Sequence, residues 1–367
     1  MSALYLGLIS GTSADGIDAA LLRFDPEPAI LAAATREYPP QLRERLLALT
    51  AAQAAISLDE LGALDVEVGE CFADAANLLL AGQNVPAEAV AAIGSHGQTV
   101  RHRTAGRFPF SMQIGDPAVI AEKTGICTVA DFRRADIAAG GQGAPLAPAF
   151  HAFAFASRAP CAVLNLGGIA NLSLISAERP ALGFDTGPAS CLMDAWIGRH
   201  QGLACDLDGA WARSGTVNHE LLDTLLEDPY FSAPAPKSSG REYFNLDWLD
   251  ARLGHCAIST ADVQTTLLAL TVRSIVDALR GCAPEVKELL VCGGGVHNQA
   301  LMADLSAALS PLPVASTSSA GIDPDFVEAA LFAWLARERL VGRPGNLPSV
   351  SGARGPRVLG AIHPAPR

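Results

Sequence analysis

The segment that decides the fold is residues 4–24, LYLGLISGTSADGIDAALLRF. Leu4–Ile9 and Ile17–Phe24 are mostly apolar, as is typical of two buried strands. Small residues at 10–16 separate them, so a tight hairpin is predicted whose backbone can approach a ligand closely. Ala162–Leu166, Gly167-Gly168 and Ile169–Ile175 repeat this order about 160 residues later, which is the spacing of a domain duplication.

The rest of the chain alternates strands with helices. Apolar runs predict short strands at 90–93, 126–130 and 289–292. Helical spacing is found at 42–52, 58–80, 260–279, 298–309 and 324–340. This alternation predicts an α/β protein. We expect two domains, the first formed by residues 1–130 plus 341–367 and the second by residues 131–340.

Composition excludes several classes of protein. An apolar fraction of 50% over 367 residues is enough for a large core and excludes global disorder. The net charge of −12 without a Lys/Arg cluster argues against binding to nucleic acid or an anionic membrane. The eight cysteines, including Cys256, have no CxxC spacing, so a zinc ribbon is not expected. The N-terminus has no basic region typical of a signal peptide, so we expect a cytoplasmic protein.

The sequence also lacks the common lysine-dependent phosphate motifs. Its three lysines are Lys123, Lys237 and Lys287, and none of them follows a glycine as in a P-loop. No GxGxxG follows a strand, and no GxSxG or HExxH motif is present. What remains is three glycine-rich turns after strands, at 11–16, 167–168 and 293–295. Such turns present backbone N–H groups that can hold phosphate.

The order of these turns resembles the actin-like ATPase superfamily. More closely, seven segments resemble the anhydro-N-acetylmuramic acid kinases: Gly7–Asp18, Ser95–Thr99, Asp131–Arg133 with Asp136, Gly140–Leu146, Asn165–Leu172, Phe184–Pro188 and Cys292–Asn298. The resemblance covers nearly the whole chain and departs at Ala14, where a larger apolar residue is expected. It implies a bilobal actin-like sugar kinase fold, with two duplicated α/β domains around a central cleft.

Asp185 is the candidate catalytic residue. It follows a predicted strand, and Pro188 is placed to open a helix, so the residues alone allow either a helix cap or a base. The resemblance favours a catalytic base. Its carboxylate, with an ordinary pKa of about 3.9, is ionised at pH 7 and can accept a proton.

The resemblance assigns nucleotide binding to the three turns. The residues implied are Gly11, Thr12, Ser13, Ala14, Asp15, Gly16, Ile17, Asp18, Gly167, Gly168, Asn171, Gly293, Gly294, Gly295 and Asn298. ATP with Mg²⁺ is the implied cofactor, with Asp15 near the metal through water. From the residues alone, turn chemistry is the alternative role for both; a position near the metal is favoured for Asp15, whereas Asp18, which starts a strand, suits either role.

The sugar-binding residues implied are Thr12, His96, Gln98, Arg133, Asp136 and Glu328. An arginine suits a carboxylate such as the lactyl group because it can bind in a bidentate way. The residues leave open whether Arg133 or Arg134 faces the sugar, and the family pattern favours Arg133. Glu328 lies in an apolar stretch of a predicted helix, either on its solvent-exposed face or aimed into a cleft, and the resemblance favours a sugar contact.

The function implied is phosphorylation of 1,6-anhydro-N-acetylmuramic acid by ATP with hydrolytic opening of its anhydro ring, in cell-wall recycling. A kinase of another anhydro sugar such as levoglucosan, or an actin- or chaperone-type ATPase, is the alternative. The resemblance also implies a homodimer.

Asp206–Gly209 begins like an EF-hand loop, but Ala210 and Val217 stand where ligands are needed, which excludes calcium. Pro236–Glu242 is a polar loop without an assigned role.

Overall fold

The computed structural model describes residues 3–25, 27–50, 55–254, 258–283 and 285–366. Cys256 lies outside these residues, and the other seven cysteines are free thiols. The chain forms two compact units. Unit 1 contains Met1–Phe150 and Phe326–Arg367, and unit 2 contains His151–Asp325. No helix among the described residues is long and apolar enough to span a membrane.

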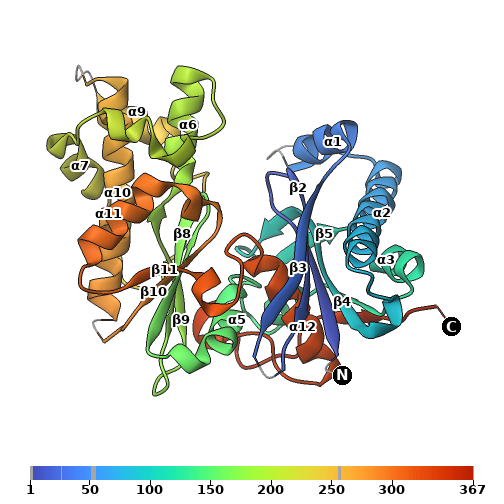
Figure 1. Cartoon of the computed structure of the whole chain (residues 1–367). Coiled ribbons are helices and arrows are strands. Elements are labelled where there is room, and N and C mark those ends of the chain that lie inside the picture. Colours follow the sequence, from blue (N-terminus) through green and yellow to red (C-terminus); the bar gives the residue numbers. More distant parts are fainter. Residues whose placement is uncertain (1–2, 26, 51–54, 255–257, 284, 367) are drawn as a thin grey trace. The chain divides into compact units, whose positions relative to one another are not determined.

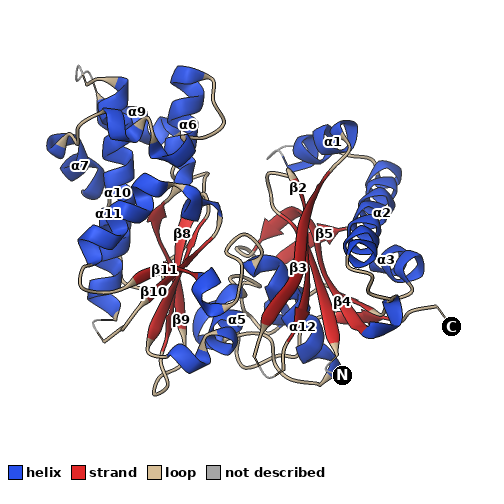
Figure 2. Cartoon of the chain, viewed as in Figure 1, coloured by secondary structure: helices blue, strands red, loops and turns tan. Residues whose placement is uncertain are grey.

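Unit 1 is built on a seven-stranded sheet (Figure 2). Its strands are β1 (Leu4–Ser10), β2 (Gly16–Arg23), β3 (Ala29–Glu37), β4 (Val90–Arg103), β5 (Phe110–Ile114), β6 (Thr128–Ala130) and β12 (Ala361–His363). The order is β12-β6-β4-β1-β2-β3, and β5 pairs with β4. β1, β2 and β3 are antiparallel, whereas β4 runs parallel to both β1 and β6.

Unit 2 repeats this topology in a five-stranded sheet. Its strands are β7 (Cys161–Leu166), β8 (Ile169–Ile175), β9 (Leu182–Pro188), β10 (Leu289–Cys292) and β11 (Val314–Ser316). The order β11-β10-β7-β8-β9 matches β6-β4-β1-β2-β3 strand for strand. The directions match as well, because β7–β9 are antiparallel and β10 is parallel to β7 and β11. The predicted α/β class and the duplication are therefore confirmed.

Helices cover both sheets (Figure 1). Those of unit 1 are α1 (Pro40–Thr50), α2 (Leu58–Gly82), α3 (Pro117–Thr124), α4 (Arg134–Ala138), α12 (Val327–Leu340) and α13 (Pro348–Ser351). Those of unit 2 are α6 (Ser190–Gln201), α7 (His219–Leu226), α8 (Pro229–Ser232), α9 (Leu246–Leu253), α10 (Thr260–Cys282) and α11 (Gln299–Leu309). The chain passes between the units within α5 (Ala147–Ala154). α3 begins with a capped turn, in which Asp116 accepts the Ala118 N–H and Pro117 stands at the first helical position.

Two glycines let α12 lie directly on the sheet of unit 1. Leu6 and Leu8 of β1 belong to the core under α2, so Gly7 faces the opposite side. Gly7 pairs with Gly94 of β4, and a Cβ on either would collide with a backbone carbonyl of α12. The helix is buried nearly all round, which fixes the position of Glu328 in its first turn.

Three details differ from the sequence-based expectations. β4 extends from Val90 to Arg103 and not only over the predicted residues 90–93, so His96 lies inside a long strand. Asp185 lies within β9, and α6 begins only at Ser190, so Pro188 does not open the helix. Residues 131–150 and 326–340 belong to unit 1, because α12 packs on β1 and β4 and because α4 is bonded to the C-terminal segment.

Candidate functional site

The first turn offers an open backbone to a ligand. Gly11, Thr12 and Asp15 are exposed, and a Cβ built on Gly11 would meet only the Ser13 hydroxyl, at 3.8 Å. Ala14 is buried at φ 50°, and its N–H donates to Gly11 O at 3.0 Å, which closes the turn. The side chains of Ala14 and Ile17 lie in the core, so these residues can contribute only backbone groups.

Arg43 fixes the Asp15 end of the turn, a contact that the sequence did not reveal. Its Nε–H donates to Ala14 O at 3.1 Å, and its Nη2 lies 2.5 Å from Asp15 Oδ1. The described residues contain no group of three or more His, Cys, Asp or Glu suited to a metal. One exposed carboxylate fits Mg²⁺ only as a cation held mainly by nucleotide phosphates and water. Asp18 is engaged by the Thr35 hydroxyl at 2.6 Å.

His96 and Arg133 form a fixed pair in unit 1. Arg133 Nε–H donates to His96 Nε2 at 3.0 Å, and Arg133 Nη1 donates to Gly143 O at 2.7 Å. His96 Nδ1 lies 3.0 Å from Gly97 O, so the hydrogen bonds assign the proton to Nδ1 and make the ring neutral. Burial, together with the Arg133 charge, lowers the pKa of His96 well below its usual range. Burial also lowers the pKa of Arg133 to about 10.

Arg133 is therefore bonded to His96, another of the predicted sugar-binding residues, whereas Arg134 is not. The Arg134 side chain is exposed and lies 3.4 Å from the carboxylate of Asp131. Glu328 is exposed at the surface, and desolvation by the surrounding protein is the main cause that raises the pKa of its carboxyl group. The Arg133 charge opposes this rise, and the Asp18 carboxylate adds to it. Electrostatic coupling thus links Glu328 with both Arg133 and Asp18.

The predicted sugar-binding residues Asp136 and Gln98 are buried and bonded to the protein around them. Asp136 is 0% exposed and accepts from Asn346 Nδ2 at 2.6 Å, Ser351 Oγ at 2.7 Å and Gly143 N at 2.8 Å. Gln98 is also buried, and its Nε2 donates to Gly11 O at 3.0 Å. Both side chains are therefore buried and bonded to backbone groups, Asp136 to that of Gly143 and Gln98 to that of Gly11.

The lowered pKa of His96 makes the free energy of unfolding depend on pH. The unfolded pKa is about 6.5 and the folded one is lower, so the stabilisation is complete above pH 6.5 and is lost as pH falls below it. We expect the difference in unfolding free energy between wild type and His96→Gln to shrink below pH 6.5, by up to about 1.4 kcal/mol per pH unit. Urea unfolding of both proteins at pH 7.5 and 5.5 measures this. A difference that is equal at both pH values would contradict the neutral assignment.

Asp185 is held at three points in unit 2. Its Oδ1 accepts from Asn171 Nδ2 at 2.8 Å, the residue opposite it on β8. Its Oδ2 accepts from Ser239 N at 2.9 Å and Ser238 Oγ at 3.1 Å. The side chain is half-buried, so the carboxylate is fixed in orientation but still reachable.

The loop that holds Asp185 is the polar segment Pro236–Glu242, for which no role was predicted from the sequence. Lys237 O accepts the Asp185 N–H at 2.9 Å, and Tyr230 Oη donates to Asp185 O at 2.8 Å. Asp228, 1% exposed, anchors the start of this segment by accepting from Tyr243, Trp248 and Arg252. In the sequence, the adjacent Ser238 and Ser239 were the available indication of this role. The fold then brings them next to β9.

The second and third turns differ in how open they are. The carbonyls of Gly167 and Gly168 accept the N–H groups of residues 189–191, which begin α6. Gly293 and Gly295 pack on the end of β7, where a Cβ would collide with Asn165 or Leu166. A Cβ on Gly294 would meet nothing within 4 Å. Asn298 Oδ1 caps α11 by accepting the Leu301 N–H at 3.0 Å.

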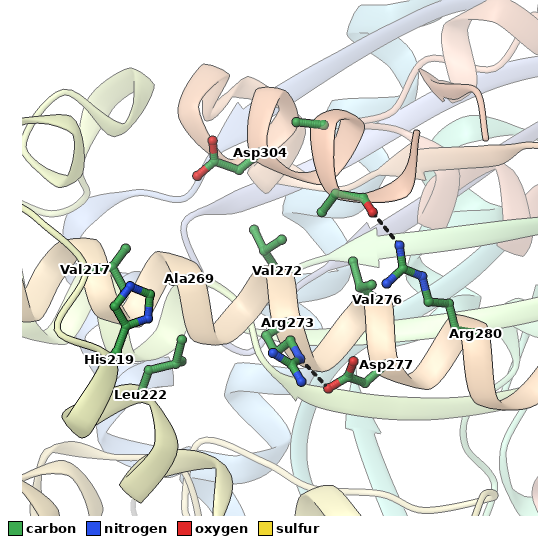
Figure 3. Close-up of a pocket in the computed structure, with 12 residues that line it drawn as sticks. Val217, His219, Leu222, Ala269, Val272, Arg273, Val276, Asp277, Arg280 and Asp304 are labelled. Atoms are coloured by element: carbon green, nitrogen blue, oxygen red, sulfur yellow. Dashed lines mark hydrogen bonds and ion pairs between the residues drawn. The ribbon is translucent and has the colours of Figure 1, made fainter. Parts of the chain in front are cut away.

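A separate cavity of about 710 Å³ lies among α7, α10 and α11 of unit 2 (Figure 3). Apolar side chains such as Val272 and Val276 line it together with the Arg273–Asp277 ion pair. None of the predicted site residues lines it.

Comparison with known proteins decides the family. The family model described as anhydro-N-acetylmuramic acid kinase matches residues 3–365. The chain belongs to this family. It is 55% identical over 369 residues to the anhydro-N-acetylmuramic acid kinase of Xanthomonas campestris pv. campestris strain 8004, covering 99% of this chain and 98% of the relative. It is 50% identical to the kinase of the same name from Pasteurella multocida strain Pm70, covering 98% and 96%.

Among solved structures, component A of the Acidaminococcus fermentans (R)-2-hydroxyglutaryl-CoA dehydratase aligns with a TM-score of 0.49 and 13% identity, covering 91% of this chain and 98% of that chain. Membership of the anhydro-N-acetylmuramic acid kinase family rests on the sequence matches. It confirms the prediction that this chain is a kinase.

Proposed function

We propose that the chain transfers the γ-phosphoryl group of ATP to O6 of 1,6-anhydro-N-acetylmuramic acid while water opens the anhydro ring. The products are N-acetylmuramic acid 6-phosphate and ADP, formed in cell-wall recycling. The observation that carries the proposal is the arrangement at Asp185, a reachable carboxylate oriented by Asn171, Ser238 and Ser239. The names of the full-length relatives support the substrate.

The bridging O6 is an ether oxygen and has no proton to lose, so the base must act on water. We assign Asp185 to accept a proton from this water, whose oxygen attacks C1 of the sugar. The C1–O6 bond breaks, and O6 forms a bond to the γ-phosphorus as ADP leaves. A base positioned in this way contributes about 10²–10⁴ in rate.

We assign the sugar contacts of unit 1 to Arg133, His96, Glu328 and Thr12. The Arg133 guanidinium suits the lactyl carboxylate, and its hydrogen bonds to His96 and Gly143 hold the guanidinium in place. Glu328 is an acceptor for sugar hydroxyl or amide groups. Asp136 and Gln98 act through the backbone groups that they hold.

We assign the nucleotide to the three glycine-rich turns. Exposed Gly11, Thr12 and half-buried Ser13 suit phosphate oxygens, and open Gly294 suits the nucleoside. Asp15 would hold Mg²⁺ through water; the ion would neutralise charge on the phosphates. We also propose a cytoplasmic homodimer; light scattering of the purified protein tests the dimer.

The experiment that tests the function is ATP turnover with a panel of anhydro sugars. We expect rapid turnover with 1,6-anhydro-N-acetylmuramic acid, slow turnover with levoglucosan, which lacks the lactyl and N-acetyl groups, and little turnover without sugar. Faster turnover with levoglucosan would favour the other anhydro-sugar kinase. Turnover that does not depend on any sugar would favour an ATPase of the actin or chaperone type.

A further inference from the structure

The side chain of Arg241 lies against the second glycine-rich turn of unit 2. A Cβ built on Gly168 would lie 2.5 Å from Arg241 Nε and 3.1 Å from Cζ. The guanidinium of Arg241 therefore lies directly over this turn at Gly168. Arg241 is exposed, and within the described part of the chain its side chain makes no hydrogen bond or ion pair.

Arg241 lies in the Pro236–Glu242 loop, and the other cation of that loop, Lys237, is already hydrogen-bonded. Lys237 Nζ donates to Tyr230 O at 2.8 Å and to Phe231 O at 3.0 Å. Because Lys237 is tied to these carbonyls, Arg241 is the cation of this loop that can reach a ligand. The loop also fixes Asp185 through Ser238 and Ser239, so Arg241 belongs to the segment that organises the proposed base.

The first N–H groups of α6 are not free to bind a phosphate at this turn, so a nearby cation would add to what the turn can bind. The carbonyls of Gly167 and Gly168 already accept the first N–H groups of α6, so those helix N–H groups are not free for an anion. Arg241 also lines a cavity of about 610 Å³ together with Cys191, Asp194 and Phe244. Its charge opposes the rise that burial causes in the pKa of Cys191 and of Asp194.

We propose that Arg241 binds the phosphate chain of the nucleotide at the Gly167-Gly168 turn. This inference rests on the proposed function and adds a residue to it. A guanidinium presents a planar fork that matches two phosphate oxygens, and it supplies the positive charge that a P-loop lysine supplies in other kinases. The ligand class is a nucleoside di- or triphosphate, and adenosine alone does not use this contact.

The test compares Arg241→Ala, Arg241→Lys and wild type by isothermal titration with ATP, ADP and adenosine. Arg213→Ala, which removes another exposed arginine of unit 2, is the matched control. We expect Arg241→Ala to weaken ATP and ADP binding about 10- to 100-fold, as for loss of a hydrogen bond to a charged group, with adenosine binding unchanged. Arg241→Lys should recover part of the affinity, and Arg213→Ala should match wild type.

Two results would overturn the assignment. The first is an ATP affinity of Arg241→Ala within twofold of wild type. The second is an equal loss for ATP and adenosine, which would mean that Arg241 only supports the fold of the loop. Failure of the proposed function is seen separately, because wild type would then show no turnover that depends on the anhydro sugar, whatever Arg241→Ala does to nucleotide binding.

Discussion

Asp185→Asn is expected to lower kcat by about 10²–10⁴ and to leave ATP affinity almost unchanged. The substitution keeps the shape of the side chain but removes its ability to take a proton from water. The hydrogen bonds can be kept as well. The oxygen of the new amide can accept from Ser238 and Ser239, and the Asn171 amide can rotate so that its oxygen accepts from the new NH₂ group. Single-turnover kinetics and titration with ATP measure the two quantities.

Asp223→Asn is the matched control, since it makes the same change of charge on an exposed side chain of α7 in unit 2. It should leave kcat within the error of wild type. If Asp185→Asn also turned over at nearly the wild-type rate, Asp185 would be a structural residue of β9 and the assignment of the base would be wrong.

Gly94→Ala is expected to destabilise the protein by about 1–3 kcal/mol or more, because the new methyl group must fit against α12. It would collide with the carbonyl of Phe332 and lie 3.1 Å from the Cβ of Ala336. Gly94 and its partner Gly7 are both covered by α12, so the helix cannot shift away from one without losing contact with the other. Movement of α12 would also displace Glu328 and raise KM for the sugar.

Gly62→Ala provides the control for this prediction. Gly62 lies in α2, and a Cβ there meets nothing within 4 Å. Alanine is the better helix former by about 0.5–1 kcal/mol, so this variant should be as stable as wild type or more stable. Thermal unfolding of the three proteins gives the comparison. A wild-type melting temperature for Gly94→Ala would show that α12 packs less closely than described.

Local sequence patterns predicted much of the fold. Both hairpins and the strand at 289–292 were predicted because apolar runs were bounded by small turn residues. β4 was predicted only at residues 90–93, since Ser95–Thr99 is polar and lacks the apolar pattern of a strand. In the structure these residues pair with β1 on one side and β5 on the other, and this tertiary pairing outweighs local propensity.

The candidate site was predictable in its residue types but not in its contacts. The motif around Asp185 identified the carboxylate, yet a sequence cannot show that residues 237–239 fold back onto β9. For the same reason Asp136 and Gln98 were interpreted as sugar contacts, although their polar atoms are buried against the protein. Burial depends on the whole chain, so a polar motif residue can be a ligand contact or an internal support.

In the proposed reaction, water attacks the sugar and not ATP. A single turnover in oxygen-18 water, quenched quickly and analysed by mass spectrometry, tests it directly. We expect one solvent oxygen at C1 of the sugar product and none above background in its phosphate group, since O6 comes from the anhydro ring. Rapid quenching is needed because slow anomeric exchange also labels C1. Label in free inorganic phosphate would mean that water attacks ATP, and absence of label from both positions would mean ordinary transfer to a hydroxyl; either result would contradict the account.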